Sequence, residues 1–276
     1  MINGYLTMAA SALKQDGRTP AIILNKVVYQ LSRHWLLTLT LLLAVFIGLP
    51  WLAPVFMKLG WTQAGEAIYL IYSAQCHQLP QRSYFLFGDD PMLPFTTIQT
   101  LWANTNDPMA LRQFVGQAEV GWKVAWSDRM VYMYTSLLLS GIAFWPLRKR
   151  LKPLSTWGFA LFLLPMALDG ISHMVSDITG GIGGGFRFSN EWLAALTGNA
   201  FQATFYAGDA LGSFNSWMRL ISGALFGIGV VWLIYPRLHI AFNDTANQIA
   251  AKLHRREARM DAGNEQLSKD PIQQAQ

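Results

Sequence analysis

The sequence predicts an all-α fold, a polytopic integral membrane bundle of four transmembrane helices with both termini cytoplasmic and a long exported loop between helices one and two. Three observations predict it. Of the 276 residues, 52% are apolar and 13% are charged, about half the charged share of an ordinary soluble domain. Four long stretches carry almost no charge. Lys and Arg gather in alternate connecting segments.

Composition also excludes several classes of protein. The low charge argues against a freely soluble enzyme. The net charge of +5 is not gathered on one basic face, so nucleic acid is not an expected partner. A single cysteine excludes an intrachain disulfide and a zinc site of four thiolates.

The first span is predicted at about 35–57, where 23 residues between His34 and Lys58 carry no charge. This length crosses roughly 30 Å of hydrocarbon. The remaining spans are predicted at about 130–147, 157–175 and 217–235.

The basic residues predict the direction of these spans. Residues 1–34 contain four Lys or Arg, and the stretch 148–152 contains four with no acid. The loop 58–129 has five basic and six acidic residues. By the positive-inside rule, we expect a multi-pass protein of the cell membrane with the loops 58–129 and 176–216 exported.

The segments outside the spans are both predicted to be cytoplasmic. In the N-terminal segment 1–34, Thr19-Pro20 predicts a helix start. The residues that follow fit an interfacial helix or a simple extension of the first span. The polar tail 237–276 is expected to be partly disordered, from Ala262 onwards.

Two groups of ionisable residues are candidates for a site. Asp169, His173 and Asp177 follow one helix face at intervals of four residues. The Asp169/His173 pair can share a cation, or the carboxylate can orient the imidazole. The alternative is that these residues form hydrogen bonds with neighbouring helices.

The second group is Cys76-His77, followed by Arg82, in the exported loop. A thiol beside an imidazole suits a soft metal ion. The alternative is a structural turn with a solvated histidine and an inert buried cysteine.

The predicted topology places both groups on the exported side, together with Arg129 and Arg219. We therefore expect one polar site there. Candidate ligands of a divalent ion such as zinc are Cys76, His77, Asp169 and His173. Candidate residues for binding a cofactor or small polar ligand are Arg82, Arg129 and Arg219. Of these, Arg129 or Arg219 could hold an anion. Asn190 and Asn215 open two similar segments, NEWLAALTG and NSWMRLISG, and each suits a helix N-cap.

The segments CHQLPQRSYFLFG, GWKVAWSDRMVYMY, PMALDGISHMVSD and NSWMRLISGALFG resemble a bacterial and archaeal membrane family, domain of unknown function two-zero-eight-five. The resemblance spans about residues 66–235 and implies a multi-span membrane fold with a polar cluster, but no activity. Family members often have cysteines before the Arg at the second span, where this chain has Trp126, Ser127 and Asp128. The positions that match the family's polar motif are Cys76, His77, Pro80, Arg82, Ser83, Arg129, Asp169, Gly170, Asn215, Arg219 and Gly223.

Three functions fit these patterns. The first is binding of a divalent metal ion or small polar ligand at the exported site. The second is a role as accessory or assembly subunit, with the polar residues joining helices of a membrane complex. The third is a small oligomeric transporter with Asp169 and His173 as a proton relay. Expected partners are the lipid bilayer and membrane proteins or further copies of the chain, and no nucleophile motif predicts a reaction.

Overall fold

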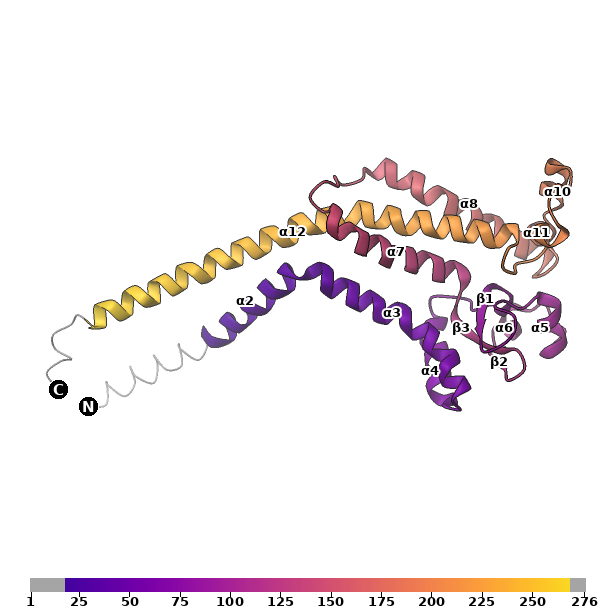
Figure 1. The fold of residues 1–276 in the computed structure, drawn as a ribbon, viewed down its shortest axis with the longest axis horizontal. Coiled ribbons are helices and arrows are strands. Elements are labelled where there is room, and N and C mark those ends of the chain that lie inside the picture. The colour runs from indigo at the N-terminus through magenta and orange to yellow at the C-terminus, as the bar shows by residue number, and fades with distance from the viewer. Residues whose placement is uncertain (1–17, 269–276) are drawn as a thin grey trace. The chain divides into compact units, whose positions relative to one another are not determined.

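The computed structural model describes residues 18–268, and these are mostly helical (Figure 1). Four helices are long and apolar enough to cross a membrane, in agreement with the four predicted spans. They are α3 (Trp35–Lys58), α7 (Asp128–Leu147), α8 (Thr156–Gly180) and α12 (Phe214–Ser268). Many apolar side chains of α8 point away from the protein; Leu161, for example, is 70% exposed. This is the pattern of a helix that faces lipid.

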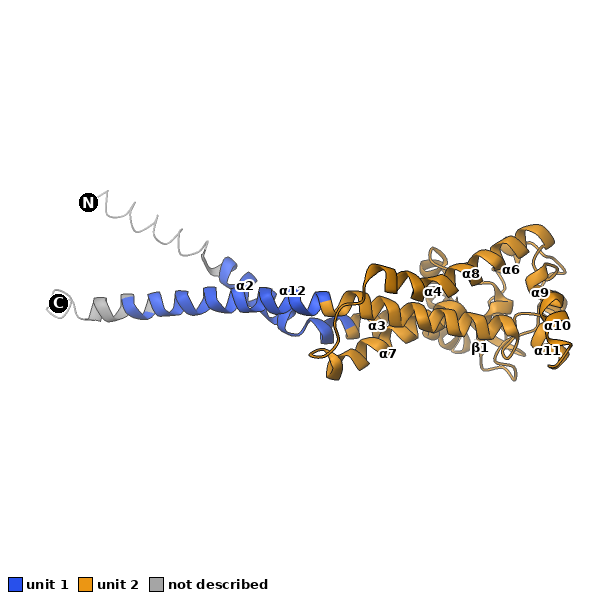
Figure 2. Cartoon of the chain, turned by 90° about the horizontal axis from the view of Figure 1, so that it is seen from above, with its two compact units in different colours: residues 1–39, 237–276 blue, residues 40–236 orange. Residues whose placement is uncertain are grey.

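The chain divides into two compact units (Figure 2). One unit is formed by Thr40–Pro236, and the other joins the residues up to Leu39 with those from Arg237 onwards. The first unit contains α7, α8 and the candidate site. The second contains α2 (Arg18–Arg33) and the C-terminal part of α12.

Helices α7 and α12 pack with their backbones in close contact. A Cβ atom added at Gly227 would lie 2.8 Å from the carbonyl oxygen of Met133, and one at Gly223 would lie 3.1 Å from the Met133 nitrogen. The Ser136 hydroxyl donates to the Gly223 carbonyl across the same contact, at 3.2 Å. Small residues at such positions let membrane helices approach closely, and this contact brings the start of α7 next to the start of α12.

The loop between the first two spans corrects the all-α prediction. It holds a three-stranded antiparallel sheet in the order β1-β3-β2. The strands are β1 (Ser83–Leu86), β2 (Gly116–Gln117) and β3 (Gly121–Ser127), and the helices are α4 (Thr62–Ser73), η1 (Pro80–Arg82), α5 (Phe95–Leu101) and α6 (Pro108–Leu111). Four consecutive residues of β3, Lys123–Trp126, are fully buried. Such a short buried run lacks the alternation that distinguishes a strand from a helix in the sequence.

Two apolar cores join this loop to the spans. One contains Tyr72, Cys76 and Trp126 and packs against α3 through Phe46. The other contains residues of β1, α5 and α6 together with Ile182, which follows α8. β3 ends at Ser127 and α7 begins at Asp128. The start of α7 therefore lies at the edge of the packed sheet.

The segment between α8 and α12 consists of short helices. They are α9 (Phe186–Ser189), α10 (Glu191–Thr197) and α11 (Ala203–Tyr206). The glycines before α9 allow a close approach: at Gly183, whose φ is +83°, an added Cβ would meet the Phe95 ring at 2.4 Å. Arg187 on α9 is thereby placed beside α8.

The predicted tail differs from the structure. α12 continues past the membrane-length stretch to Ser268, so residues 262–268, for which disorder was expected, are drawn as the end of this helix. Residues 269–276 lie outside the described part. At the other end, the described part of α2 runs from Arg18 to Arg33. Residues 1–17 also lie outside the described part.

Candidate functional site

Four arginines and four aspartates meet where the sheet, α7, α8, α9 and α12 come together. We call this set the arginine–aspartate cluster; it comprises Arg82, Arg129, Arg187, Arg219, Asp128, Asp169, Asp177 and Asp209. Buried charges are costly unless they are paired and hydrogen-bonded. The cluster satisfies this condition by ion pairs between segments that are far apart in the sequence.

One half of the cluster is rich in carboxylates. Arg219, 1% exposed, donates from Nε to Asp128 at 2.7 Å and from Nη1 to Asp209 at 2.8 Å. Arg82 donates to Asp209 at 2.8 Å and binds Asp177 with both Nη atoms, at 2.9 and 3.0 Å. Two guanidinium groups therefore face three carboxylates, a local charge of −1.

Electrostatics around Asp209 favour the charged forms of Asp209 and Arg82. Burial by itself raises the pKa of the Asp209 carboxyl, but the neighbouring Arg82 and Arg219 outweigh burial and hold that pKa below its usual value. Burial opposes the charge of Arg82 in the same way, and attraction to Asp209 and Asp177 leaves its pKa raised. The pairs are therefore ionised together.

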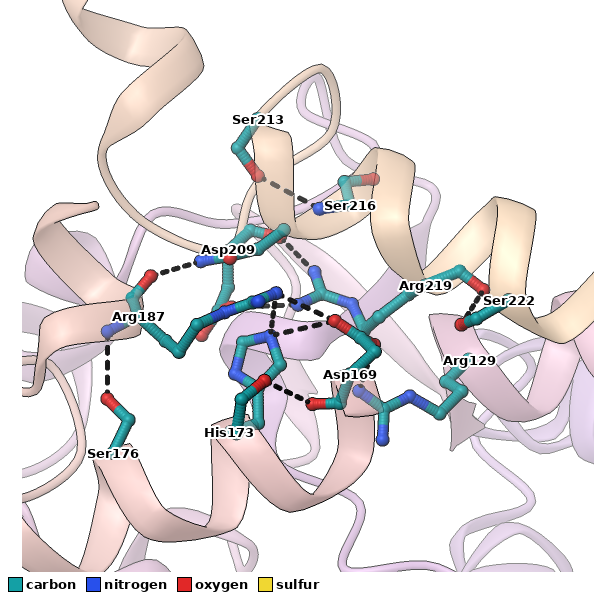
Figure 3. Close-up of polar contacts among 12 residues, drawn as sticks. Arg129, Asp169, His173, Ser176, Arg187, Asp209, Ser213, Ser216, Arg219 and Ser222 are labelled. Carbon is teal, nitrogen blue, oxygen red and sulfur yellow. Dashed lines mark hydrogen bonds and ion pairs between the residues drawn. The ribbon is translucent and has the colours of Figure 1, made fainter. Parts of the chain in front are cut away.

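The other half surrounds Asp169 on α8, and we call it the Asp169 site: Arg129, Asp169, His173 and Arg187. Arg129 donates to Asp169 Oδ2 at 2.6 Å, and Arg187 donates to Oδ1 at 2.7 Å. Figure 3 shows the Arg187 side chain passing over His173 to reach Asp169. Two guanidinium groups share one carboxylate here, so this half carries a local charge of +1.

The Asp169 site contains hydrogen-bond donors without acceptors. Arg187 Nη2 lies 3.2 Å from His173 Nε2, and a guanidinium only donates, so Nε2 accepts and the imidazole proton lies on Nδ1. Among the residues that the structure describes, His173 Nδ1, Arg129 Nε and Arg187 Nε are buried and have no hydrogen-bond partner. Buried polar groups are normally satisfied, so these three N–H groups are exceptional.

The backbone at Arg187 is anchored from three sides. The Ser176 hydroxyl on α8 accepts from the Arg187 N–H at 2.9 Å, while Asn190 and Asn215 both donate to the Arg187 carbonyl, at 2.7 and 2.6 Å. Asn190 is the N-cap residue of α10, as predicted, but its side chain makes no cap hydrogen bond. Asn215 is not an N-cap, because it lies within the first turn of α12. They fix the guanidinium of Arg187 relative to Asp169.

The structure brings together five of the seven predicted site residues. These are Arg82, Arg129, Asp169, His173 and Arg219. Asp177, which the helix rise separates from Asp169, pairs with Arg82 instead. These ion pairs bring arginines and aspartates of separate segments into contact.

The predicted metal ligands are arranged differently. The Cys76 thiol accepts from the backbone N–H groups of Gln78 and Ser127, each at 3.4 Å, and His77 is exposed. Both carboxylate oxygens of Asp169 are taken by guanidinium groups. Within 18–268, no three His, Cys, Asp or Glu residues are placed to hold a metal ion, so the expected divalent-ion site is not assembled there.

Sequence reasoning missed Arg187 and Asp209 as members of the site. Arg187 is the one basic residue in 176–216. A single arginine in an otherwise acidic loop is the sequence feature that could have identified it as a site residue. Nothing local distinguishes Asp209 from a solvated loop aspartate. Its role appears only when α12 and the sheet place Arg219 and Arg82 on either side of it.

Lys123 in β3 predicts a pH dependence of stability. It is fully buried and donates to the carbonyls of Gln78 and Arg112 at 2.9 and 2.6 Å. Burial lowers its pKa from 10.5 to about 7. Between these values the folded protein has lost the proton that the unfolded chain keeps, so the unfolding free energy rises with pH, by up to about 1.4 kcal/mol per pH unit.

We expect Lys123→Met to flatten that rise, measured as the thermal unfolding midpoint of detergent-purified protein from neutral to alkaline pH. Lys149→Met, at an exposed position after α7, is the matched control and should keep the wild-type slope. Equal slopes for wild type and Lys123→Met would contradict the expectation.

Comparison with known proteins adds a distant relative. No family model matches the chain, and no solved structure matches it. The chain is 27% identical over 186 residues to a protein of Methanocaldococcus jannaschii described as uncharacterized protein MJ1492. The match covers 64% of this chain and 91% of the archaeal protein. That description names no activity.

Proposed function

We propose that the chain is a multi-pass protein of the cell membrane that binds a small anionic ligand at the Asp169 site. The observation that carries the proposal is the set of three buried N–H groups without acceptors, on His173, Arg129 and Arg187. A carboxylate or phosphate oxygen is the acceptor that guanidinium groups prefer. The local charge of +1 favours an anion over a neutral acceptor.

The charge pattern supports the orientation of the site. Basic residues concentrate in 1–34, 148–152 and 237–276, which by the positive-inside rule are cytoplasmic. Both termini are then inside the cell, and the loops 58–129 and 176–216 are exported. The Asp169 site lies at the exported ends of the spans, so its ligand comes from outside the cytoplasm.

The arrangement favours binding over catalysis. Asp169 is the one carboxylate at the site, and both its oxygens accept from guanidinium groups. It orients Arg129 and Arg187 and is not free to act as a general base. The carboxylate-rich half holds the sheet, α7 and α12 around the site by paired charges.

Inorganic phosphate tests the proposal with the detergent-purified full chain. At constant ionic strength, phosphate in place of chloride should raise the thermal unfolding midpoint and broaden the phosphorus NMR signal. The midpoint should keep rising with the logarithm of the phosphate concentration, because a ligand at a hundred times its Kd stabilises the folded state by about 2.7 kcal/mol. Arg187→Gln should abolish both effects, because it removes a donor and one positive charge.

Arg148→Gln is the matched control. This arginine lies just after α7, away from the cluster, and its guanidinium donates to the Trp145 carbonyl. It should respond to phosphate as the wild type does. An equal response of wild type and Arg187→Gln, or no response beyond that to chloride, would reject the Asp169 site as an anion site.

A further inference from the structure

Helix α2 presents an apolar stripe that the described residues leave uncovered. Ile23, Leu24, Val27 and Leu31 are 58%, 63%, 49% and 50% exposed. Their spacing places them on one side of the helix. A stripe of this size on the surface of a protein marks an interaction site.

The opposite side of this helix and its junction with α3 are packed. Ser32 is buried, and so is Trp35, the first residue of α3. The Trp35 ring stacks on Phe242 of α12, with ring centroids 5.5 Å apart. Packing within this unit therefore holds the base of α2 while the stripe stays exposed.

The charges around the stripe fit an anionic surface. Lys26 and Arg33, seven residues apart, share the side of the helix next to the stripe, and both are exposed. α2 contains no acidic residue. Over the described residues of this unit, 18–39 and 237–268, eight Lys or Arg face four Asp or Glu.

The helix that follows α2 in the chain, α3, indicates which surface α2 can contact. Only His34 separates its last residue, Arg33, from α3, the most apolar of the four membrane-length helices. If α3 crosses a bilayer, the stripe is at the level of the lipid headgroups. An apolar face flanked by long cationic side chains is the form of a helix that lies in that interface.

We propose that α2 lies in the surface of an anionic membrane leaflet, with Ile23, Leu24, Val27 and Leu31 in the acyl boundary and Lys26 and Arg33 at anionic headgroups. This inference is independent of the Asp169 site, because it requires only that α3 spans the membrane. Of the two alternatives that the sequence leaves open for the residues after Pro20, the proposal favours an interfacial helix over a simple extension of the first span.

Spin labels on the full-length chain test the proposal in vesicles. Cys76→Ser removes the single native cysteine, and one new cysteine is then introduced at Val27 or Leu31. Asn25 is the matched control. Residues two positions apart on a helix are rotated by about 200° from each other, so Asn25 and Val27 lie on opposite sides of α2. Collisions with oxygen and with a water-soluble nickel chelate report the depth of each label.

In vesicles containing phosphatidylglycerol, the oxygen-to-nickel ratio should be severalfold higher at Val27 and Leu31 than at Asn25. Vesicles of phosphatidylcholine alone, or Lys26→Gln with Arg33→Gln, should reduce the contrast. Equal ratios at Val27 and Asn25 would overturn the proposal, and so would a contrast that is the same in both kinds of vesicle. Spectral broadening that disappears on dilution with unlabelled protein would assign the stripe to a second copy and reject the membrane surface.

Discussion

Arg219→Met is expected to lower the unfolding free energy by about 3–5 kcal/mol, the usual cost of removing one partner from a buried ion pair. Arg219 is the one guanidinium bonded to the fully buried Asp128, and it also binds the Asp209 side chain. Without it Asp128 becomes an uncompensated buried carboxylate at the start of α7. The check is the thermal unfolding midpoint and the folded yield of detergent-purified protein.

Arg148→Met is the control for loss of an arginine at the exposed end of the same helix, where the change should be small. A second variant isolates the ion pair: Asp128→Asn combined with Arg219→Met leaves no unpaired charge at α7. The double variant should be more stable than Arg219→Met alone, with a coupling of about 1–3 kcal/mol. If the single variant is no less stable than the control, the pair does not hold the two helices together.

Asp169→Asn is expected to have two opposite effects. It removes the carboxylate between Arg129 and Arg187, so the two cations repel each other, and the unfolding free energy should fall by about 3 kcal/mol. The same change raises the local charge from +1 to +2. Phosphate should therefore raise the unfolding midpoint of this variant by more than that of the wild type. If the cluster has only a structural role, the unfolding free energy should fall and the response to phosphate should not increase.

Asp177→Asn is the matched control for Asp169→Asn. It removes a carboxylate from Arg82 in the carboxylate-rich half of the cluster, and it leaves the charge at the Asp169 site unchanged. Its stability should fall while its phosphate response stays at the wild-type level. If Asp169→Asn and Asp177→Asn respond equally to phosphate, the ligand is not bound between Arg129 and Arg187.

Prediction from the sequence succeeded where the physical signal was local. The helix α7 begins at Asp128, beside the predicted bound, and Asp169 and His173 lie on one face of α8 as expected. It failed for β3, a strand of seven residues in which four consecutive residues are buried, because such a short run does not reveal its period. The expected disorder from Ala262 stays a prediction; the structure continues α12 to Ser268, and polarity alone does not separate a solvated helix from disorder.

The sequence by itself determined that four helices are long and apolar enough to cross a membrane, because transfer into hydrocarbon depends on consecutive residues. It also indicated that the ionisable residues of separate segments lie on the same side of the membrane, because the fixed rise per residue of a helix gives the depth of each residue along its predicted span. Only the tertiary structure decided which carboxylate each guanidinium meets. Arg82 and Asp209 are 127 positions apart, and Arg129 and Asp169 are 40 apart. Such pairs depend on how helices and sheet pack, and no local pattern encodes them.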